Sequence, residues 1–305
     1  MNLRIITWGL LSFLFTSFAI ADNAPNPPPA PTAAAENKAA DAKSKASKPS
    51  PTKAAAKEEH HVHWSYADGP GSPEKWGSID KANVACAAGK TQSPININTD
   101  RVLKVELPTL EFSYKPSPLS IIDNGHTVMV KYGEGSNLLV DGRQYRLLQF
   151  HFHKPSEEAI NGERTDMVVH LVHQHFDGSL AVVGVLMSTK PSISGKKTVF
   201  GGSDAPKENA LISTLWSNVP LIKNQMSDLT LTIDANQLLP ADKGYFTFMG
   251  SLTTPPCSEN VLWMVMKNPI YVSSAQVKNF ENLYPMNARP LQARGDRVIK
   301  ESNTK

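Results

Sequence analysis

The feature that most constrains the fold is a series of short apolar runs that are rich in β-branched and aromatic residues. Residues typical of tight turns separate these runs. Turn-forming pairs such as Asp141-Gly142 and Asn161-Gly162 stand between them. Because short turns join consecutive strands, the pattern predicts mainly antiparallel pairing. The predicted strands cover residues 119–122, 127–132, 138–140, 144–153, 167–175, 180–187, 229–233, 245–249 and 262–266.

Helical patterns are few by comparison. One covers residues 205–219 and ends before Pro220, and the other covers residues 274–283. Together with the strands they predict a mixed α+β fold dominated by β structure. We expect a large central, mainly antiparallel twisted sheet with short peripheral helices, in a single domain.

The first residues have the pattern of an export signal. Arg4 precedes an apolar stretch at 5–20, and small residues flank Ile20 at the end of it. This predicts a signal peptide at 1–21, cut before Asp22, and a periplasmic location; secretion, and an uncleaved anchor, are the alternatives. No later segment reaches the ~18 apolar residues of a membrane helix, so the mature chain is expected to have no membrane span.

Residues 22–60 contain no Val, Ile, Leu, Met or aromatic residue and are rich in Pro, Ala and Lys. Such a segment cannot bury enough apolar surface to offset its conformational entropy. It is predicted to be a disordered tether, with a peptidoglycan-binding or partner-binding tail as the alternative. Residues 61–305 remain as one folded domain.

The charge balance bears on the partners. The chain has 31 Lys+Arg against 28 Asp+Glu, a formal net charge of +3. This excess is too small for a protein whose task is to neutralise phosphate backbones, so nucleic acid is not expected as a partner. The sequence leaves open whether the chain forms a homodimer.

The two cysteines, Cys86 and Cys257, stand 171 positions apart. In an exported chain a disulfide between them is the economical interpretation, and two separate thiols are the alternative. Closing so long a loop could stabilise the fold by at most ~5 kcal/mol in the chain-entropy account. Neither cysteine has a second Cys or His at zinc-finger spacing.

The histidines carry the strongest chemical signal. His151 and His153 flank Phe152 on a predicted strand, so both imidazoles lie on one face, about 6.5 Å apart along it. The next strand carries His170, His173 and His175, of which His170 faces opposite to the other two. Three imidazoles are a preferred zinc site and leave a fourth position for water. Spacing alone leaves open which histidine completes the set.

Motifs along the whole domain then add a family resemblance. The sequence resembles the α-class carbonic anhydrases, particularly the exported bacterial type, from about His63 to Gln292. The matching segments, in the family's order, are His63-Trp64-Ser65-Tyr66, Gln92-Ser93-Pro94-Ile95, Asp123-Asn124-Gly125-His126, Gln149-Phe150-His151-Phe152-His153 with Pro155-Ser156-Glu157, His170-Leu171-Val172-His173, Leu180-Ala181-Val182-Val183-Gly184, Ser251-Leu252-Thr253-Thr254-Pro255-Pro256 and Asn287-Ala288-Arg289-Pro290.

The resemblance implies a zinc enzyme that reversibly hydrates carbon dioxide to bicarbonate and a proton. It makes His170 the third ligand beside His151 and His153, with one Zn²⁺ per chain. Zinc-bound hydroxide would attack the substrate. It would be available at neutral pH because zinc lowers the pKa of its bound water to about 7, the established value for carbonic anhydrases. Thr253 would accept a hydrogen bond from that hydroxide and donate to ionised Glu157. On their own, Thr253 would mark a rigid loop and Glu157 a surface carboxylate.

The same resemblance assigns the remaining site residues. His126 matches the proton shuttle, as a lone exposed imidazole with a pKa near 6.5, against the plainer alternative of a turn histidine. Tyr66 and Asn124 resemble the residues that order the water chain, and Gln149 and Asn287 those that support the ligands from behind. The substrate pocket is expected to consist of Val172, Val182, Leu252, Thr254, Val261 and Trp263.

Two departures from the family pattern concern the support of the site. Many members have an acidic residue two positions before the third histidine, where it holds the distal nitrogen; here Val168 stands there. Losing such a partner typically costs ~10–100-fold in metal affinity or activity. Met129 stands where the family commonly has an amide. The departures put the tightness of metal binding and the proton-transfer rate in question.

Two other functions are compatible with parts of the pattern. A catalytically silent binding module of the same fold would be expected to lose a ligand histidine, and here all three are present. A periplasmic zinc buffer would use the other histidines and bind several ions per chain. The histidines available for it are His60, His61, His63, His173 and His175.

Overall fold

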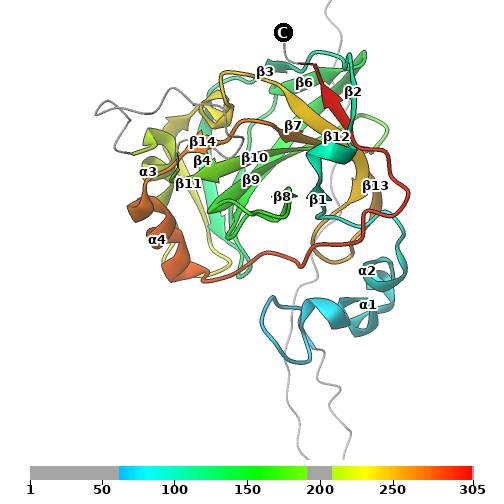
Figure 1. The fold of residues 1–305 in the computed structure, drawn as a ribbon. Coiled ribbons are helices and arrows are strands. Elements are labelled where there is room, and N and C mark those ends of the chain that lie inside the picture. The colour runs from blue at the N-terminus through cyan, green and yellow to red at the C-terminus, as the bar shows by residue number, and fades with distance from the viewer. Residues whose placement is uncertain (1–61, 191–207, 304–305) are drawn as a thin grey trace, which may run out of the picture. The chain divides into compact units, whose positions relative to one another are not determined.

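The computed structural model describes residues 62–190 and 208–303, all of which belong to one compact unit, Glu58–Lys305. The predicted signal peptide and tether lie outside the described residues. In the described part, a thirteen-stranded sheet dominates (Figure 1). Its main path runs through β11 (Met226–Ile233), β4 (Ser117–Asp123), β5 (Val128–Lys131), β7 (Arg143–His153), β9 (Met167–Gln174), β10 (Leu180–Ser188), β13 (Glu259–Met266), β12 (Tyr245–Ser251), β15 (Lys300–Ser302) and β2 (Leu103–Val105).

Short strands complete the sheet structure. Off the main path, β3 (Glu111–Ser113) pairs with β6 (Asn137–Val140), β6 pairs with β7, and β14 (Ile270–Tyr271) pairs with β10. A separate two-stranded sheet joins β1 (Asn96–Ile97) to β8 (Ala159–Ile160). All nine strands predicted from the sequence are present, and the prediction of a large, mainly antiparallel sheet is confirmed. The sequence pattern missed the two- and three-residue strands and the parallel pairing of β10 with β13.

The helices are short, as predicted, and the two longest, α3 and α4, begin at side-chain caps. α4 (Ser274–Leu283) has the predicted bounds and begins with a capping box, in which Ser273 and Gln276 bond each other's backbone. α3 (Ala210–Trp216) is shorter than the predicted 205–219, because Asn209 caps its first turn; residues 205–207 lie outside the described part. The other helical segments are α1 (Trp76–Ile79), α2 (Ala85–Ala88) and the 3₁₀ turns Pro73–Lys75, Lys81–Asn83, Thr99–Arg101 and Ala235–Leu238.

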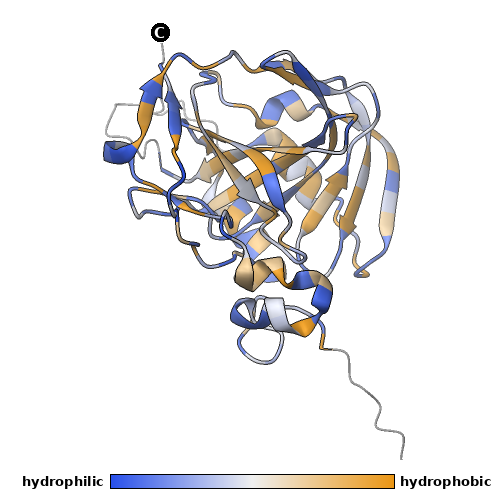
Figure 2. Cartoon of the chain, turned by 90° about the vertical axis from the view of Figure 1, so that its right-hand side faces the viewer, coloured by the Kyte–Doolittle hydropathy of each residue, from blue (hydrophilic) through white to orange (hydrophobic). Residues whose placement is uncertain are grey.

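The central strands are buried on both faces. Nearly every residue of β9 and β10 is buried, whereas β4 alternates between buried and exposed positions. Many of the central strand residues are accordingly hydrophobic (Figure 2). A strand buried on both sides can therefore present one set of side chains to a hydrophobic core and the other set to a functional site.

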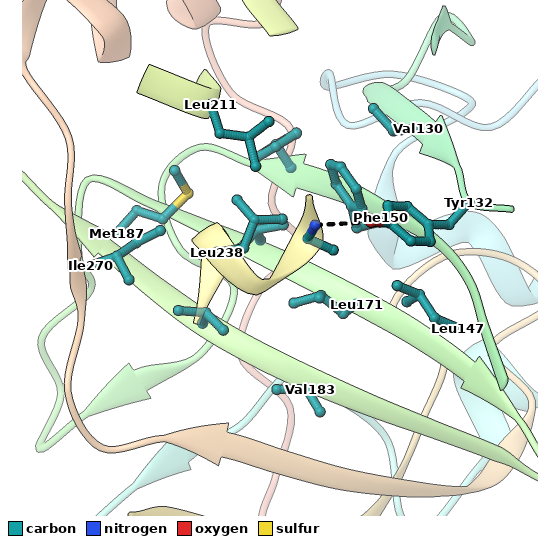
Figure 3. Close-up of a cluster of buried hydrophobic side chains, with 14 of the residues drawn as sticks. Val130, Tyr132, Leu147, Phe150, Leu171, Val183, Met187, Leu211, Leu238 and Ile270 are labelled. Atoms are coloured by element: carbon teal, nitrogen blue, oxygen red, sulfur yellow. Dashed lines mark hydrogen bonds between the residues drawn. The ribbon is translucent and has the colours of Figure 1, made fainter. Parts of the chain in front are cut away.

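The larger core covers one of these two faces. Phe150 of β7, Leu171 of β9 and Val183 of β10 pack there with Leu211 of α3 (Figure 3). In the same cluster the Ala235 amide donates to the Tyr132 hydroxyl at 3.0 Å. Since successive side chains of a strand alternate between faces, the residues between these core positions point to the opposite side of the sheet.

None of the helices in the described part of the chain has the length and apolar character needed to cross a bilayer.

Candidate metal centre

Three histidines converge on the face of the sheet opposite the larger core. β7 and β9 pair antiparallel with His151 directly across from His170, and His153 lies one side-chain row further along β7. The ring centroids are 5.0 Å apart for His151 and His153, 5.5 Å for His151 and His170, and 4.8 Å for His153 and His170. One nitrogen from each ring lies within 4.8 Å of the others. Among the described residues, only these three form such a group.

The other nitrogen of each ring has a fixed hydrogen-bond partner. Nδ1 of His151 lies 2.8 Å from Oε1 of Gln149, and Nδ1 of His153 lies 2.8 Å from the carbonyl oxygen of Asn287. Nε2 of His170 lies 3.2 Å from Oε2 of Glu158. These acceptors select the tautomers and leave Nε2 of His151, Nε2 of His153 and Nδ1 of His170 as the converging atoms.

The electrostatics of the first two rings favour neutral imidazoles. Burial, with the neighbouring charge of His170, lowers the pKa of His151 to about 3 and that of His153 well below its usual value. Burial alone would lower the pKa of His170 as well, but the charge and hydrogen bond of Glu158, with the charge of Glu157, raise it. Neutral imidazole is the form that ligates a metal.

These residues fit a zinc ion. Nε2 of His153 is buried and has no hydrogen-bond partner among the described residues, which is costly for a polar atom unless a ligand occupies the position. A tetrahedral ion with metal–nitrogen bonds of ~2.1 Å needs its ligand nitrogens about 3.4 Å apart. The three nitrogens lie within 4.8 Å of one another, so small movements of the rings bring them to that spacing. Three protein ligands leave a fourth position for water or substrate, as catalytic zinc sites require.

Glu157 is fully buried beside two of the ligands. Its Oε2 lies 3.5 Å from Nε2 of His153 and 3.8 Å from Nδ1 of His170, and its Oε1 accepts from the Arg289 amide at 2.8 Å. Burial raises the pKa of this carboxyl to about 7, against the lowering effect of His170 and of the Thr253 hydroxyl. Thr253 thus lies close enough to act on Glu157, although Oε2 makes no full hydrogen bond among the described residues.

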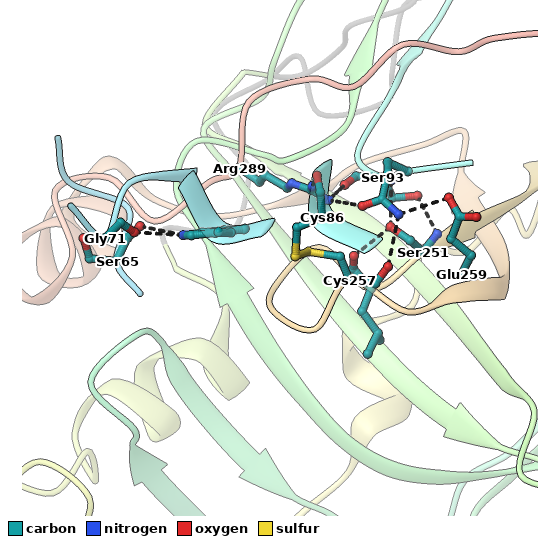
Figure 4. Close-up of a disulfide and its surroundings, with 11 residues drawn as sticks. Ser65, Gly71, Cys86, Ser93, Ser251, Cys257, Glu259 and Arg289 are labelled. Atoms are coloured by element: carbon teal, nitrogen blue, oxygen red, sulfur yellow. Dashed lines mark hydrogen bonds between the residues drawn. A yellow bond between two sulfur atoms is a disulfide. The ribbon is translucent and has the colours of Figure 1, made fainter. Parts of the chain in front are cut away.

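A disulfide fastens the loop that carries Thr253. The predicted bond between Cys86 and Cys257 is present, and Gln92 donates from its amide nitrogen to the Cys257 carbonyl at 3.1 Å (Figure 4). The buried Arg289 guanidinium donates to the Cys86 carbonyl at 3.0 Å, while the Arg289 amide holds Glu157. One residue therefore connects the disulfide to the carboxylate behind the site.

The residues predicted to line the substrate pocket lie together on the metal-facing side. Along the sheet Val172 of β9, Val182 of β10 and Trp263 of β13 form one row next to the histidine row. Val261 joins them in a second hydrophobic cluster, and the half-buried Leu252 packs against it. Thr254 is half-buried in the loop, where its carbonyl accepts from the Cys257 amide at 2.8 Å. An apolar wall of this kind suits a small, uncharged ligand.

His126 departs from the sequence expectation. It was expected to be lone and exposed, but it is half-buried and stacks on Trp64, with ring centroids 3.6 Å apart. Its Nε2 lies 3.0 Å from Nε2 of His63. Burial, His63 and Lys223 lower its pKa to about 4, so in this position the ring is a weak proton acceptor at neutral pH.

The two residues predicted to order water are placed differently from each other. Asn124 uses its Oδ1 to accept from the backbone amides of His126 and Thr127, both at 2.9 Å, so it shapes the turn. Tyr66 is buried in a cluster with Trp76 and the disulfide. Burial, followed by the charge of Glu157, raises the pKa of its phenol well above the usual value.

The predicted supports, Gln149 and Asn287, both contact ligands, Asn287 through its backbone carbonyl. The other two histidines predicted beside His170, His173 and His175, lie away from the metal site. His173 lies on the core face, where its Nε2 is 2.7 Å from the Tyr114 hydroxyl, and His175 lies beside Asp177 at a hairpin end. Sequence reasoning missed Glu158 and the contact of His63 with His126. The unusual Val168 was a signal for the first, because an unsupported ligand implies another partner.

The geometry matches the arrangement of ligands in three-histidine zinc enzymes, here on an extended twisted sheet. Comparisons with known proteins agree. The sequence model of the eukaryotic-type carbonic anhydrase family matches residues 71–303. A carbonic anhydrase of Klebsiella pneumoniae is 39% identical over 242 residues, which cover 78% of this chain and 91% of the relative.

Solved structures give the same result. An α-carbonic anhydrase of Thermovibrio ammonificans, in complex with the inhibitor sulfanilamide, superposes with a TM-score of 0.70 at 35% identity, covering 79% of this chain and 99% of its own. By sequence, dioscorin DB3L of Dioscorea polystachya is also similar. It is 34% identical over 246 residues, which cover 77% of this chain and 85% of dioscorin. The chain belongs to the α-class carbonic anhydrase family, a family of zinc-dependent enzymes that hydrate carbon dioxide, and it is an enzyme of this class.

Proposed function

We propose that this chain holds one zinc ion between Nε2 of His151, Nε2 of His153 and Nδ1 of His170, and there hydrates carbon dioxide to bicarbonate and a proton. The convergence of these three nitrogens, each on a ring whose other nitrogen is held, carries the proposal. Bound zinc supplies Lewis acidity that lowers the pKa of water to about 7, the established value for carbonic anhydrases. The presence of all three histidines favours catalysis over a silent binding role.

The surrounding residues orient the two reactants. The apolar wall of Val172, Val182 and Trp263 holds carbon dioxide and excludes competing polar ligands. Thr253 would donate a hydrogen bond from its hydroxyl to Glu157, and its oxygen would accept one from the hydroxide that bound zinc supplies, so that a hydroxide lone pair points at the carbon. Formation of the new C–O bond gives bicarbonate. Each further turnover requires that one proton leave the site.

His126 is proposed to export that proton. Its stacked position on Trp64 and its lowered pKa do not suit neutral pH, so export requires the ring to leave Trp64 and His63. A solvated imidazole has a pKa near 6.5, which matches the task. The turn that Asn124 shapes would set the path of this movement. Tyr66 would order water near Glu157, since its buried phenol stays protonated.

The central experiment measures zinc content and carbon dioxide hydration together. The purified protein should bind one zinc and hydrate carbon dioxide in a stopped-flow pH-indicator assay. His151→Ala should lose both, by more than the ~10–100-fold that loss of an outer partner costs. His175→Ala is the matched control, because His175 lies outside the metal site, and it should keep both. Full hydration activity in His151→Ala would refute the proposal. Sulfanilamide should inhibit the wild type.

We also propose that the protein is exported to the periplasm, after removal of a signal peptide at 1–21. The disulfide supports export, because such bonds persist in oxidising compartments. Expression with the native leader in a Gram-negative host, followed by N-terminal sequencing of the periplasmic fraction, should find Asp22 at the mature terminus. Recovery in the medium would favour secretion, and a membrane-bound chain with an intact leader would favour an anchor.

A further inference from the structure

Two adjacent buried carboxylates lie at the two nitrogens of one ligand ring. Oε2 of Glu157 lies 3.8 Å from Nδ1 of His170, and Oε2 of Glu158 lies 3.2 Å from Nε2 of the same ring. Side-chain exposure is 1% for His170 and 0% for both carboxylates. Glu157 has the orienting role proposed above, whereas Glu158 belongs to no motif of the sequence analysis.

The strand that carries His170 has no polar group to hold this ring. Val168 lies two residues before His170 on the same face of β9, directly across from His153, and is fully buried. It offers no hydrogen-bond acceptor. Glu158 approaches from the segment between β7 and β8, and so brings a carboxylate to the nitrogen from outside the strand.

The buried carboxylate of Glu158 has few partners. An unpaired buried charge is strongly unfavourable. Nε2–H of His170 gives Oε2 of Glu158 a charge-assisted hydrogen bond, whereas Oε1 has no hydrogen-bond partner among the described residues. Arg164, whose pKa burial lowers, lies close enough for the charges of Glu157 and Glu158 to counter that effect. A buried acid with these contacts, and no other side-chain partner among the described residues, is placed for His170.

We propose that Glu158 is the positioning residue for the third metal ligand, doing from position 158 what a carboxylate at position 168 would do. The inference rests on the proposed zinc site. Glu158 accepts from Nε2–H of His170, which fixes the tautomer, turns the Nδ1 lone pair toward the other two ligands and strengthens that nitrogen as a donor. The departure at Val168 is thus compensated within the same chain.

Zinc affinity of the isolated protein tests this directly. The zinc dissociation constant and dissociation rate are measured by competition with a chromophoric chelator. Glu158→Ala should weaken zinc binding by ~10–100-fold, whereas Glu158→Gln should lose less, because its amide oxygen still accepts. Adding Val168→Glu to Glu158→Ala should recover affinity by relocating the carboxylate. Adding Val168→Ala instead is the matched control, and it should recover none.

A spectroscopic readout covers the case in which Glu158→Ala fails to fold. In zinc-loaded protein the proton on Nε2 of His170 should give a slowly exchanging downfield NMR resonance. Glu158→Gln should move it upfield, because a neutral amide is a weaker acceptor than a carboxylate. An unchanged resonance overturns the assignment.

The affinity measurements have their own contrary outcomes. Wild-type zinc affinity in Glu158→Ala overturns the assignment. So does a loss in that variant that neither Glu158→Gln nor the relocated carboxylate reduces, since that is the result of a merely structural role. A wild-type protein that binds no zinc would instead overturn the proposed function.

Discussion

Two groups of histidines in this molecule are held in opposite ways. His153 and His170 are buried and His151 is half-buried, all on central strands, and each has one nitrogen fixed by a hydrogen bond. His63 and His126 lie at the end of the described chain and in a turn, where they contact each other and the ring of Trp64. In the first group the hydrogen bond on one ring nitrogen fixes the direction of the lone pair on the other. In the second group the rings are held by stacking on Trp64 and by one contact between the two imidazoles.

The difference corresponds to the role proposed for each group. A metal-binding histidine must keep one tautomer and one orientation. A position on paired central strands suits this, because the neighbouring strands hold the groups that fix the ring. A proton shuttle must reach both the site and solvent, and only a ring that can turn does this. The lowered pKa of His126 then belongs to the stacked position and not to the residue itself.

The largest effect within this comparison is expected beside the three strand histidines, at Thr253. Thr253→Val removes the hydroxyl near Glu157 and keeps the shape of the side chain. Turnover should fall by about 100-fold, because a poorly oriented nucleophile loses that order of rate. Zinc content should stay at one per chain, since Thr253 makes no hydrogen bond to the ligand histidines among the described residues. The check is the hydration assay with metal analysis, and unchanged turnover would remove Thr253 from the mechanism.

A smaller effect is expected at the second group, at His126. His126→Ala should lower turnover in weak buffer, by less than the ~10²–10⁴-fold of a fixed acid–base group, because water carries part of the proton flux. Added imidazole should restore the rate, and zinc affinity should not change. Turnover that does not depend on buffer concentration in the wild type would contradict a shuttle role for His126.

How far the sequence predicted this site depends on the regularity of the backbone. The period of two in a strand correctly separated His170 from His173, which lies on the core face against Tyr114. It also puts Val172 on the same face of the strand as His170. These predictions succeeded because a strand fixes side-chain direction through local geometry alone.

The sequence pattern failed where the backbone has no period. Glu158 lies in an irregular segment between β7 and β8, so nothing in its spacing indicates that it reaches His170. The contact of His63 with His126 joins residues 63 positions apart, and neither residue lies in a helix or a strand. The parallel pairing of β10 with β13 also depends on a long connection, whose path spacing cannot predict.

The smallest expected effect is a pKa change at His126 itself. The groups that act on this imidazole are His63 and Lys223, which lower its pKa, and Asp123, which raises it; burial lowers it most. His63→Ala removes one of the lowering charges, so the pKa should rise from about 4 toward, without reaching, the usual 6.5. An NMR titration of the His126 ring measures it, with His175→Ala as the control.

The sign of the linked stability change follows from the same shift. Because folding lowers the pKa of His126, the folded state binds fewer protons than the unfolded chain between pH 6.5 and about 4. This contribution to stability is present above pH 6.5 and is lost as the pH falls through that window. His63→Ala raises the lower limit of this pH range, the pKa of the folded state, so the range over which the stability is lost should become narrower at its acid end. An unchanged or lower pKa in the variant would show that His63 does not lower the pKa of the His126 imidazole, and the contrast between the two histidine groups would then rest on the stacking of His126 on Trp64.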